Sequence, residues 1–337
     1  MKEKILIVLL ALLFVASIAV GVTLITGGTF NKEQLRFLSG REGYGVVNLY
    51  GAIKSAQSSG LLGTPREADA VVARLQAMGR NPLVKAVVLR VNSPGGSVAA
   101  SQEIYEEVRR LATDKRVPVV VSISDLGASG GYYVSCGATK IFANPGSLVG
   151  SVGVISVFPN IQGLLSDKLG VKATVLTSGK WKDAGSPLRE MTGEERDRFQ
   201  KQIAGVYDQF FEVVKKARLG LIRDRLRDSG LQAEEAEKKA LEQLQTLAQG
   251  QIYTGEDAYI QGLIDQLGNF HDAVVEAKRL GGLPPDAPMI GSPSGVGLGE
   301  LISPLAGAAR DGGLMEAADS LTTSRIEYLY LPGGLLK

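Results

Sequence analysis

The sequence predicts an α/β protein built around a largely parallel sheet. Two observations lead to this fold class: apolar, β-branched runs alternate with amphipathic stretches of helical period, and glycine-rich turns join several of these runs to the stretch that follows. Strands that alternate with helices favour parallel pairing within one sheet. With 337 residues, of which 45% are hydrophobic and 21% charged, the chain is long enough to bury a large core.

The N-terminal segment predicts a membrane anchor. After a charged start at residues 1–4, residues 5–27 are expected to form a transmembrane helix, because they are almost wholly apolar and about 20 such residues cross a bilayer. Lys2 and Lys4 favour a cytoplasmic N-terminus, which puts the rest of the chain outside. A cleaved signal peptide is the alternative, with small residues at positions 17 and 19. Residues 28–44 have the mixed, polar composition of a linker.

The predicted strands and helices begin at residue 45. Strands are expected at 45–53, 84–91, 117–124, 140–143, 152–157, 171–177 and 326–331, and helices at 66–78, 98–112 and from 192 through the charged stretch 221–249. Ser97 is the expected N-cap of the second helix. Thr192 and Glu195 have the spacing of a capping box at the start of the long helix, which carries an apolar stripe.

Composition excludes several classes of function. The formal net charge is only +2 and no basic stripe with interleaved aromatics occurs, so we expect no nucleic-acid partner. Cys136 is the only cysteine, which excludes an intramolecular disulfide, and its apolar neighbours predict a buried, unreactive thiol. His271 is the only histidine, so a multi-histidine metal site is excluded and any Ser-His-Asp triad would depend on this residue. We expect no metal or nucleotide cofactor.

Ser129 is the candidate nucleophile. It stands in Asp125-Leu-Gly-Ala-Ser-Gly-Gly-Tyr-Tyr133, between a predicted buried strand and a helix-like stretch. Small neighbours allow a sharp turn and leave the hydroxyl uncovered beside free N–H groups of a helix start. An acyl-transfer nucleophile needs this arrangement, and an incidental serine in a glycine-rich turn is the alternative.

A second glycine-rich turn, Asn92-Ser-Pro-Gly-Gly96, joins a predicted strand to a helix. Its backbone N–H groups can form a pocket for a negatively charged oxygen. The N–H groups of Gly96 and Gly130 are therefore the candidate donors of an oxyanion hole. An ordinary tight turn is the alternative reading.

A lysine is the expected base. Lys180 and Lys182 flank the only tryptophan, and either could act if apolar surroundings keep it neutral. If the stretch is extended, both lysines point the same way, so the residues alone do not choose between them. Ser151 is a candidate to hydrogen-bond and orient the lysine, or it simply ends a turn.

Together these stretches resemble a known peptidase family. The order of Asn92-Ser-Pro-Gly-Gly96, Ala128-Ser-Gly-Gly-Tyr-Tyr133, Gly150-Ser-Val-Gly-Val154 and Ser178-Gly-Lys-Trp-Lys-Asp183 is similar to that of signal peptide peptidase A in its short, single-repeat form. The similarity covers residues 45–280, and the first stretch alone also resembles the Clp peptidase and the crotonase superfamily. The resemblance implies a Clp/crotonase-like fold of repeated ββα units, with a peptidase domain at 45–281. After residue 281 the composition shifts to Gly, Pro, Ser and Ala, which predicts a flexible or irregular tail at 282–337.

The resemblance also implies roles for individual residues. Ser129 matches the nucleophile, Lys182 the general base of a Ser-Lys dyad, and Ser151 the serine that helps to hold the lysine. Gly96 and Gly130 match the oxyanion-hole positions. Lys180 falls where the family varies.

The family further implies a location, an assembly and a substrate. Its members are serine endopeptidases anchored in the bacterial inner membrane, with the catalytic domain on the extracytoplasmic side. They form dome-like homo-oligomeric rings, and in the short form neighbouring subunits complete each site. Their substrates are remnant signal peptides, cut within the apolar core after release from preproteins. The long charged segment 221–249 and the extended tail depart from the family pattern and leave the ring size open.

Three other functions are the alternatives. A crotonase-type enzyme for acyl-CoA would keep Gly96 in an oxyanion hole, but no acidic catalytic residue or adenine-binding region is evident. A related membrane protease would cut membrane-protein tails instead of signal peptides. A non-catalytic ring scaffold would use residues 194–249 as its interaction surface, and the intact Ser129 and Lys182 argue against it.

Overall fold

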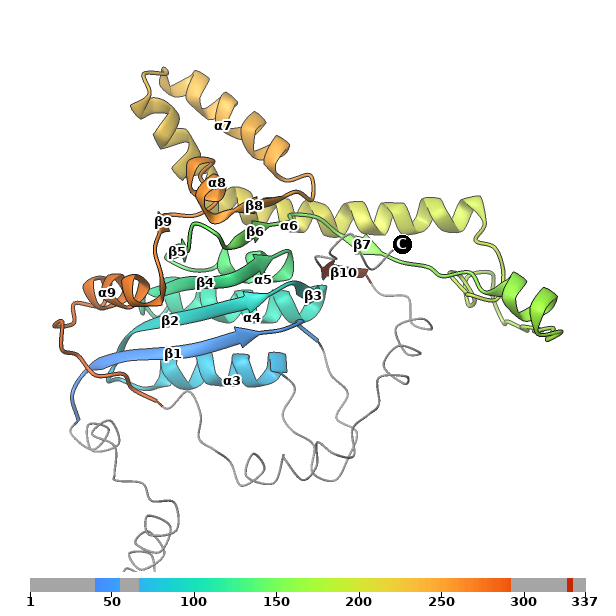
Figure 1. The fold of residues 1–337 in the computed structure, drawn as a ribbon, viewed down its shortest axis with the longest axis horizontal. Coiled ribbons are helices and arrows are strands. Elements are labelled where there is room, and N and C mark those ends of the chain that lie inside the picture. The colour runs from blue at the N-terminus through green and yellow to red at the C-terminus, as the bar shows by residue number, and fades with distance from the viewer. Residues whose placement is uncertain (1–39, 55–66, 292–325, 330–337) are drawn as a thin grey trace, which may run out of the picture.

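A central, mostly parallel sheet organises the fold (Figure 1). The structure is a computed structural model that describes residues 40–54, 67–291 and 326–329. Five strands pair in parallel, in the spatial order β1, β2, β4, β5 and β9. They are β1 (Gly43–Tyr50), β2 (Val84–Ser93), β4 (Val119–Ala128), β5 (Lys140–Ala143) and β9 (Gln266–Leu267). The predicted α/β class with largely parallel pairing is confirmed.

Two short strands extend the sheet beside the end of β4. β6 (Leu148–Gly150) pairs in parallel with the last residues of β4, and β8 (Ile252–Thr254) pairs antiparallel with β6. Ala128 lies opposite Gly150, so the two chain segments leave the sheet side by side. The residues that follow are Ser129 and Ser151, and the topology therefore brings two of the predicted site residues to one end of the sheet.

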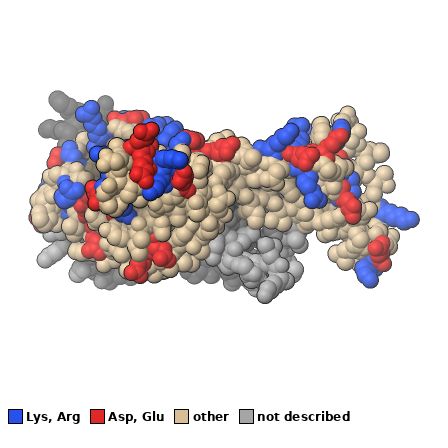
Figure 2. Space-filling view, turned by 90° about the horizontal axis from the view of Figure 1, so that it is seen from above, with Lys and Arg blue, Asp and Glu red and all other residues tan. Residues whose placement is uncertain are grey.

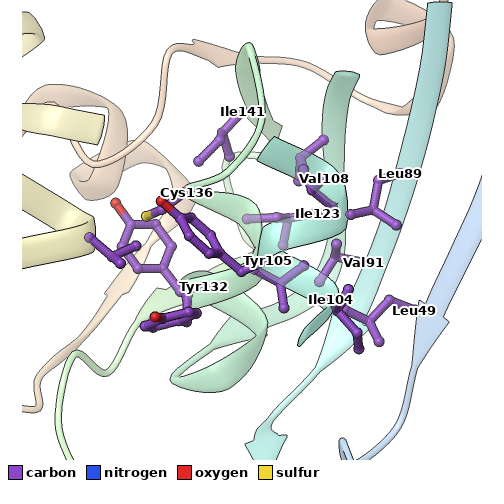
Figure 3. Packing of buried hydrophobic residues seen from close by; sticks show 14 of the residues in the cluster. Leu49, Leu89, Val91, Ile104, Tyr105, Val108, Ile123, Tyr132, Cys136 and Ile141 are labelled. Atoms are coloured by element: carbon purple, nitrogen blue, oxygen red, sulfur yellow. The ribbon is translucent and has the colours of Figure 1, made fainter. Parts of the chain in front are cut away.

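Helices cover both faces of the sheet. One face is buried by α3 (Glu67–Arg80), α4 (Val98–Thr113) and α5 (Gly130–Ser135), and the other by α9 (Phe270–Leu280). Figure 3 shows Val108 of α4 near Ile123 of β4, and Ile104 of α4 beside Leu49 of β1; all four side chains are buried. Each such side chain stabilises the fold by roughly 1.5–3 kcal/mol. Strands that are covered on both faces have continuous apolar sequences. Such strands can be predicted from the sequence even though polar and apolar residues do not alternate along them.

The caps predicted for two helices are confirmed. Ser97 accepts a hydrogen bond from the backbone N–H of Ala100 at the start of α4. Thr192 and Glu195 form a reciprocal capping box at the start of α6 (Gly193–Asp228). These bonds satisfy N–H groups that have no partner inside a helix, and each cap contributes about 1 kcal/mol.

The prediction of a strand at 171–177 is wrong. These residues are irregular and lie on a projecting segment, residues 157–192, that we call the arm; Val171 is 50% exposed and Leu176 is 91% exposed. The arm contains one short helical turn, η1 (Leu164–Lys168). A β-branched run needs a partner edge to form a strand, and no described segment pairs with this one. The strand predicted at 152–157 shortens to β7 (Ile155–Ser156).

The long helix α6 joins the arm to the body. It has 36 residues; its first half runs beside the arm, and its second half packs against α7 (Ala233–Leu247) (Figure 1). Figure 2 shows, on the right, a narrower part of the molecule that projects from the body. Phe210, Val213 and Val214 of the predicted apolar stripe are buried in the core. Deeper in the body, Arg218 Nη1 lies 2.8 Å from Asp265 Oδ2, and the side chain of Arg218 is 3% exposed. The next helix, α8 (Gly255–Ile260), follows β8.

A second, three-stranded sheet lies at the same end of the molecule as Ser129 and Ser151. Its strands are β3 (Gly95–Ser97), β10 (Ile326–Leu329) and β7, with β10 in the middle and antiparallel to both neighbours. The final strand predicted at 326–331 is confirmed over 326–329. Residues 326–329 therefore run beside the glycine-rich turn that ends β2.

Several predictions concern residues outside the described ranges. The transmembrane anchor predicted at 5–27 lies outside these ranges, and so does most of the tail predicted at 282–337. Within the ranges given above, no helix is both long enough and apolar enough to span a bilayer. The beginning of the tail belongs to the packed body, because Leu283, Ala287 and Ile290 are buried and Ile290 N donates to Tyr44 O (2.7 Å).

Candidate active site

Ser129 occupies a strained corner between β4 and α5. Its backbone has φ 51° and ψ −117°, a combination that residues with a Cβ rarely adopt. Its N–H donates to Gly150 O (2.8 Å), and its side chain makes no cap bond to α5. Ser129 is 1% exposed, yet its Oγ has no hydrogen-bond partner among the described residues. The strain and the unpartnered hydroxyl each cost about 1–3 kcal/mol, which is typical of a site kept for function.

Close backbone approach explains the glycines beside Ser129. A Cβ on Gly130 would lie 2.5 Å from Ser101 Oγ and 3.3 Å from the backbone nitrogen of Gly96. Any side chain at position 130 would therefore push the 92–96 turn away from α5. Gly130 and Gly96 are close neighbours, as a shared oxyanion hole requires.

The N–H of Gly96 is directed toward β10. Ile53 N donates to Gly95 O and Ser97 N donates to Ile53 O, both at 2.7 Å. Successive residues of a strand direct their N–H groups to opposite edges. Because the N–H of Ser97 is directed toward Ile53, the N–H of Gly96 is directed away from it, to the edge where β10 pairs. The N–H of Gly130 belongs to the first turn of α5, whose N–H groups have no carbonyl partner within the helix. This arrangement fits an oxyanion hole beside Ser129.

Two buried serines brace the glycine-rich turn, and sequence reasoning missed both roles. Ser93 Oγ accepts a hydrogen bond from Gly95 N (3.1 Å) and donates to Gly51 O (2.6 Å). Ser101 Oγ donates to Ser97 O (2.9 Å) at the start of α4. Both serines are fully buried. Ser93 stands inside the recognised turn sequence, but its bond to Gly51 joins positions 42 residues apart and has no local signal.

Ser151 stands next to the corner. It has φ 52°, is 7% exposed, and its N–H donates to Gln251 O (2.7 Å). Gly150, the residue before it, accepts the backbone hydrogen bond from Ser129. Among the described residues only Ser129, Ser151 and Arg116 combine a Cβ with a positive φ. Two of these three unusual backbones therefore occur at the two predicted serines.

The lysines lie on the arm and are exposed. Lys182 is in a turn closed by its own N–H and Gly179 O (3.1 Å), so the two lysines do not stand on an extended strand. Lys180 Nζ forms an ion pair with Glu194 and lies 5.0 Å from the centre of the Trp181 ring. The described residues offer Lys182 Nζ no ion pair. The ion pair with Glu194 engages the amine of Lys180, whereas that of Lys182 is left available, which makes Lys182 the better candidate for a base.

Cys136 is buried at the end of α5, as predicted, near Tyr132 (Figure 3). Burial raises the pKa of its thiol to about 11. The thiol therefore stays protonated at neutral pH and does not compete with Ser129 as a nucleophile.

The sequence matches a known peptidase family. The match to peptidase family S49 covers residues 112–228 and 231–283, which is half of the chain and includes Ser129, Ser151 and Lys182. This chain belongs to peptidase family S49. A second match, to Clp protease, covers residues 62–148 and so includes Gly96 and Gly130.

Several relatives of this S49 family member carry protease or peptidase names. Protease 4 of Salmonella typhi is 36% identical over 212 residues, 63% of this chain and 31% of that protein. An Enterococcus faecium protein named as a signal peptide peptidase is 35% identical over 206 residues, 61% of this chain and 54% of that protein. The chloroplast serine protease SPPA of Arabidopsis thaliana is 29% identical over 257 residues, 75% of this chain and 34% of that protein. The chain spans less than two thirds of the length of each relative.

His271 gives this S49 family member no triad within one chain. It is exposed at the start of α9, on the sheet face opposite to α5, and its backbone N–H donates to Asn269 Oδ1 (2.7 Å). Its place in the fold is that of a helix-start residue. Across the described ranges, no group of three potential metal-binding side chains occurs either.

Proposed function

We propose that this chain is a membrane-anchored serine endopeptidase that cleaves hydrophobic peptides, released signal peptides above all. The observation that carries the proposal is Ser129, a buried and strained serine with an unpartnered hydroxyl beside Gly96 and Gly130. Membership of peptidase family S49 supports peptide hydrolysis. The name of the Enterococcus faecium relative supports signal peptides as substrates.

In the proposed reaction, neutral Lys182 accepts the proton of Ser129 as Oγ attacks a peptide carbonyl. The N–H groups of Gly96 and Gly130 donate hydrogen bonds to the oxyanion, and Ser151 helps to orient the lysine. The protonated lysine gives its proton to the leaving amine as the C–N bond breaks. Water then attacks the acyl-enzyme, with the lysine again acting as the base.

We expect the substrate to bind as an added strand. β10 pairs antiparallel with both β3 and β7, so this position accepts an extended backbone directly beside Gly96. Strand addition gains main-chain hydrogen bonds whatever the side chains are, which suits a protease for many apolar sequences. Residues 326–329 hold the position in this chain, and a substrate therefore has to displace them.

Lys182 is expected to meet Ser129 of a neighbouring copy in a ring. The arm exposes several apolar side chains, among them Leu169 (62%) and Leu176 (91%). Exposed apolar surface of this kind favours association with another chain. Docking of the arm would also take Lys182 out of water, which disfavours the charged form of an amine.

The test compares four full-length chains in detergent on a fluorogenic peptide with a leucine-rich core: wild type, Ser129→Ala, Lys182→Ala and Lys180→Ala. We expect the first two variants to lose activity by a factor on the order of 10³ or more, and Lys180→Ala to stay near wild type. A mixture of Ser129→Ala and Lys182→Ala should regain part of the activity, because some neighbours then combine an intact serine with an intact lysine. Cleavage that persists in Ser129→Ala would reject the mechanism.

The same assay examines strand addition. A synthetic peptide of residues 322–333 is expected to raise KM and leave kcat unchanged, because it competes for the position between β3 and β7. A scrambled peptide of the same composition is the control. Equal inhibition by the two peptides would contradict a specific strand site.

A further inference from the structure

Arg189 joins the peptide next to Lys182 to the start of α6. Its Nε donates to Asp183 Oδ2 (2.7 Å), and its Nη2 donates to the backbone carbonyl of Asp183 (3.3 Å). On the other side, Nη1 donates to Glu195 Oε2 (2.9 Å) and Nη2 forms an ion pair with Glu195 Oε1. Nη1 also donates to Glu190 O (3.0 Å). One guanidinium therefore bridges the residue that follows Lys182 and a carboxylate of the long helix.

Glu195 is a fixed point. Its side chain is 3% exposed, and its Oε2 also accepts the backbone N–H of Thr192 (2.9 Å) in the capping box of α6. The helix itself is anchored in the core further along, through the ion pair of Arg218 and Asp265. A chain of contacts therefore runs from the core along α6 to Asp183.

The residues before Lys182 are held only by exposed contacts. Residues 166–182 are all exposed. Lys180 forms an ion pair with Glu194, whose own side chain is 66% exposed, and the ring of Trp181 lies 5.1 Å from the guanidinium carbon of Arg198, an exposed residue of α6. Exposed ion pairs contribute little, about 0–1 kcal/mol, and they restrict a side chain weakly. The bridge through Arg189 is thus the main link between the lysine and a rigid element.

We propose that Arg189 is a positioning residue for the general base: it holds the backbone at Lys182 at a set distance and direction from α6, so that the amine arrives correctly at Ser129. This inference rests on the proposed function. A general base must lie within hydrogen-bond reach of its proton, and an error of about 1 Å in placement costs on the order of 10²-fold in rate. The planar fork of arginine makes two parallel contacts at once, which a lysine at position 189 cannot reproduce.

The charges at the bridge persist over the pH range in which a protease works. Hydrogen bonds from Arg189 lower the pKa of Asp183, and the same arginine lowers the pKa of Glu195 to about 2. Both carboxylates therefore remain ionised at neutral pH, and the bridge stays intact when the lysine loses its proton.

The experiment uses the full chain, the leucine-rich peptide and two matched variants, Arg189→Gln and Arg196→Gln. Both remove one positive charge near the start of α6, but Arg196 is exposed and the described residues offer its side chain no ion pair. We expect Arg189→Gln to lower kcat at least tenfold, with KM within twofold of wild type and an unchanged particle size on gel filtration. Arg189→Lys should recover only a small part of kcat, and Asp183→Asn should add little to Arg189→Gln because both break the same contact.

Equal kcat values for Arg189→Gln and Arg196→Gln would overturn the inference. It would also be overturned if Arg189→Gln lost activity through dissociation of the assembly or through a rise in KM alone, since the residue would then be structural. The variants Ser129→Ala and Lys182→Ala distinguish a failure of the proposed function from a failure of the role proposed for Arg189. If these variants stay active, the proposed function fails; if they are inactive while Arg189→Gln is fully active, only the role of Arg189 fails.

Discussion

The two halves of the proposed dyad lie in regions of opposite character. Ser129 stands in a corner that is packed on every side, next to the fully buried Ser93 and Ser101. Lys182 stands on an arm whose residues 166–182 are all exposed. Dense packing lets the corner keep a strained backbone and an unpartnered hydroxyl. The arm has no such support, so its geometry depends on a few ion pairs and, as we propose, on a second chain.

The comparison predicts that a methyl group has very different effects in the two regions. Gly130→Ala places a Cβ 2.5 Å from Ser101 Oγ and 3.3 Å from Gly96 N, whereas at Gly179 nothing lies within 4 Å of an added Cβ. We expect Gly130→Ala to lower kcat about 10²-fold or more, because it separates the two oxyanion donors. Gly179→Ala should change kcat less than twofold. Steady-state kinetics on the leucine-rich peptide measures both.

The kinetic result for Gly130→Ala is interpretable only if the variant folds and assembles like the wild type. Circular dichroism and gel filtration of the variant are the controls, and a folded, assembled but inactive protein is the expected outcome. If Gly130→Ala cleaves the peptide as fast as Gly179→Ala, the N–H groups of Gly96 and Gly130 do not act together.

Sequence alone could predict the corner because its signals are local. A buried strand, a run of small residues and a helix start follow one another around Ser129, and the caps at Ser97 and Thr192 join residues three positions apart. The supports of the corner could not be predicted in the same way. Ser93 reaches Gly51 and Ser101 lies against Gly130 only after the chain has folded.

The arm resisted prediction for a different reason. The β-branched run at 171–177 has the composition of a strand. Such a composition shows that the side chains suit a pleated, half-buried surface, but it does not show whether a neighbouring strand is present to pair with the run. Spacing alone left Lys180 and Lys182 equivalent. The fold separates them, because only Lys180 contacts Glu194 while Lys182 stands next to the bridge made by Arg189.

A smaller effect is expected on stability when the strain at the corner is removed. Ser129→Gly takes away both the Cβ that opposes φ 51° and the unpartnered hydroxyl, while Ser129→Ala takes away only the hydroxyl. Both variants should be inactive. We expect Ser129→Gly to raise the free energy of unfolding by about 1 kcal/mol, a net value that already includes the loss due to the extra chain entropy of glycine. Ser129→Ala should raise it by a smaller amount. Urea unfolding at one fixed protein concentration gives the values, and a Ser129→Gly protein less stable than wild type would show that the corner is not strained.

The smallest predicted effect concerns the arm in acid. Arg189 lowers the pKa of Glu195 from its ordinary value of 4.5 to about 2, so the bridge contributes fully above pH 4.5 and is lost as the pH falls from there toward 2. The only tryptophan reports this change, because Trp181 lies 5.1 Å beneath the guanidinium carbon of Arg198 on α6. We expect its emission to shift between pH 4.5 and 2 in wild type. Glu195→Gln, which has no carboxyl to protonate, should show the shifted emission already at pH 6. An identical acid transition in both proteins would mean that Glu195 does not hold the arm.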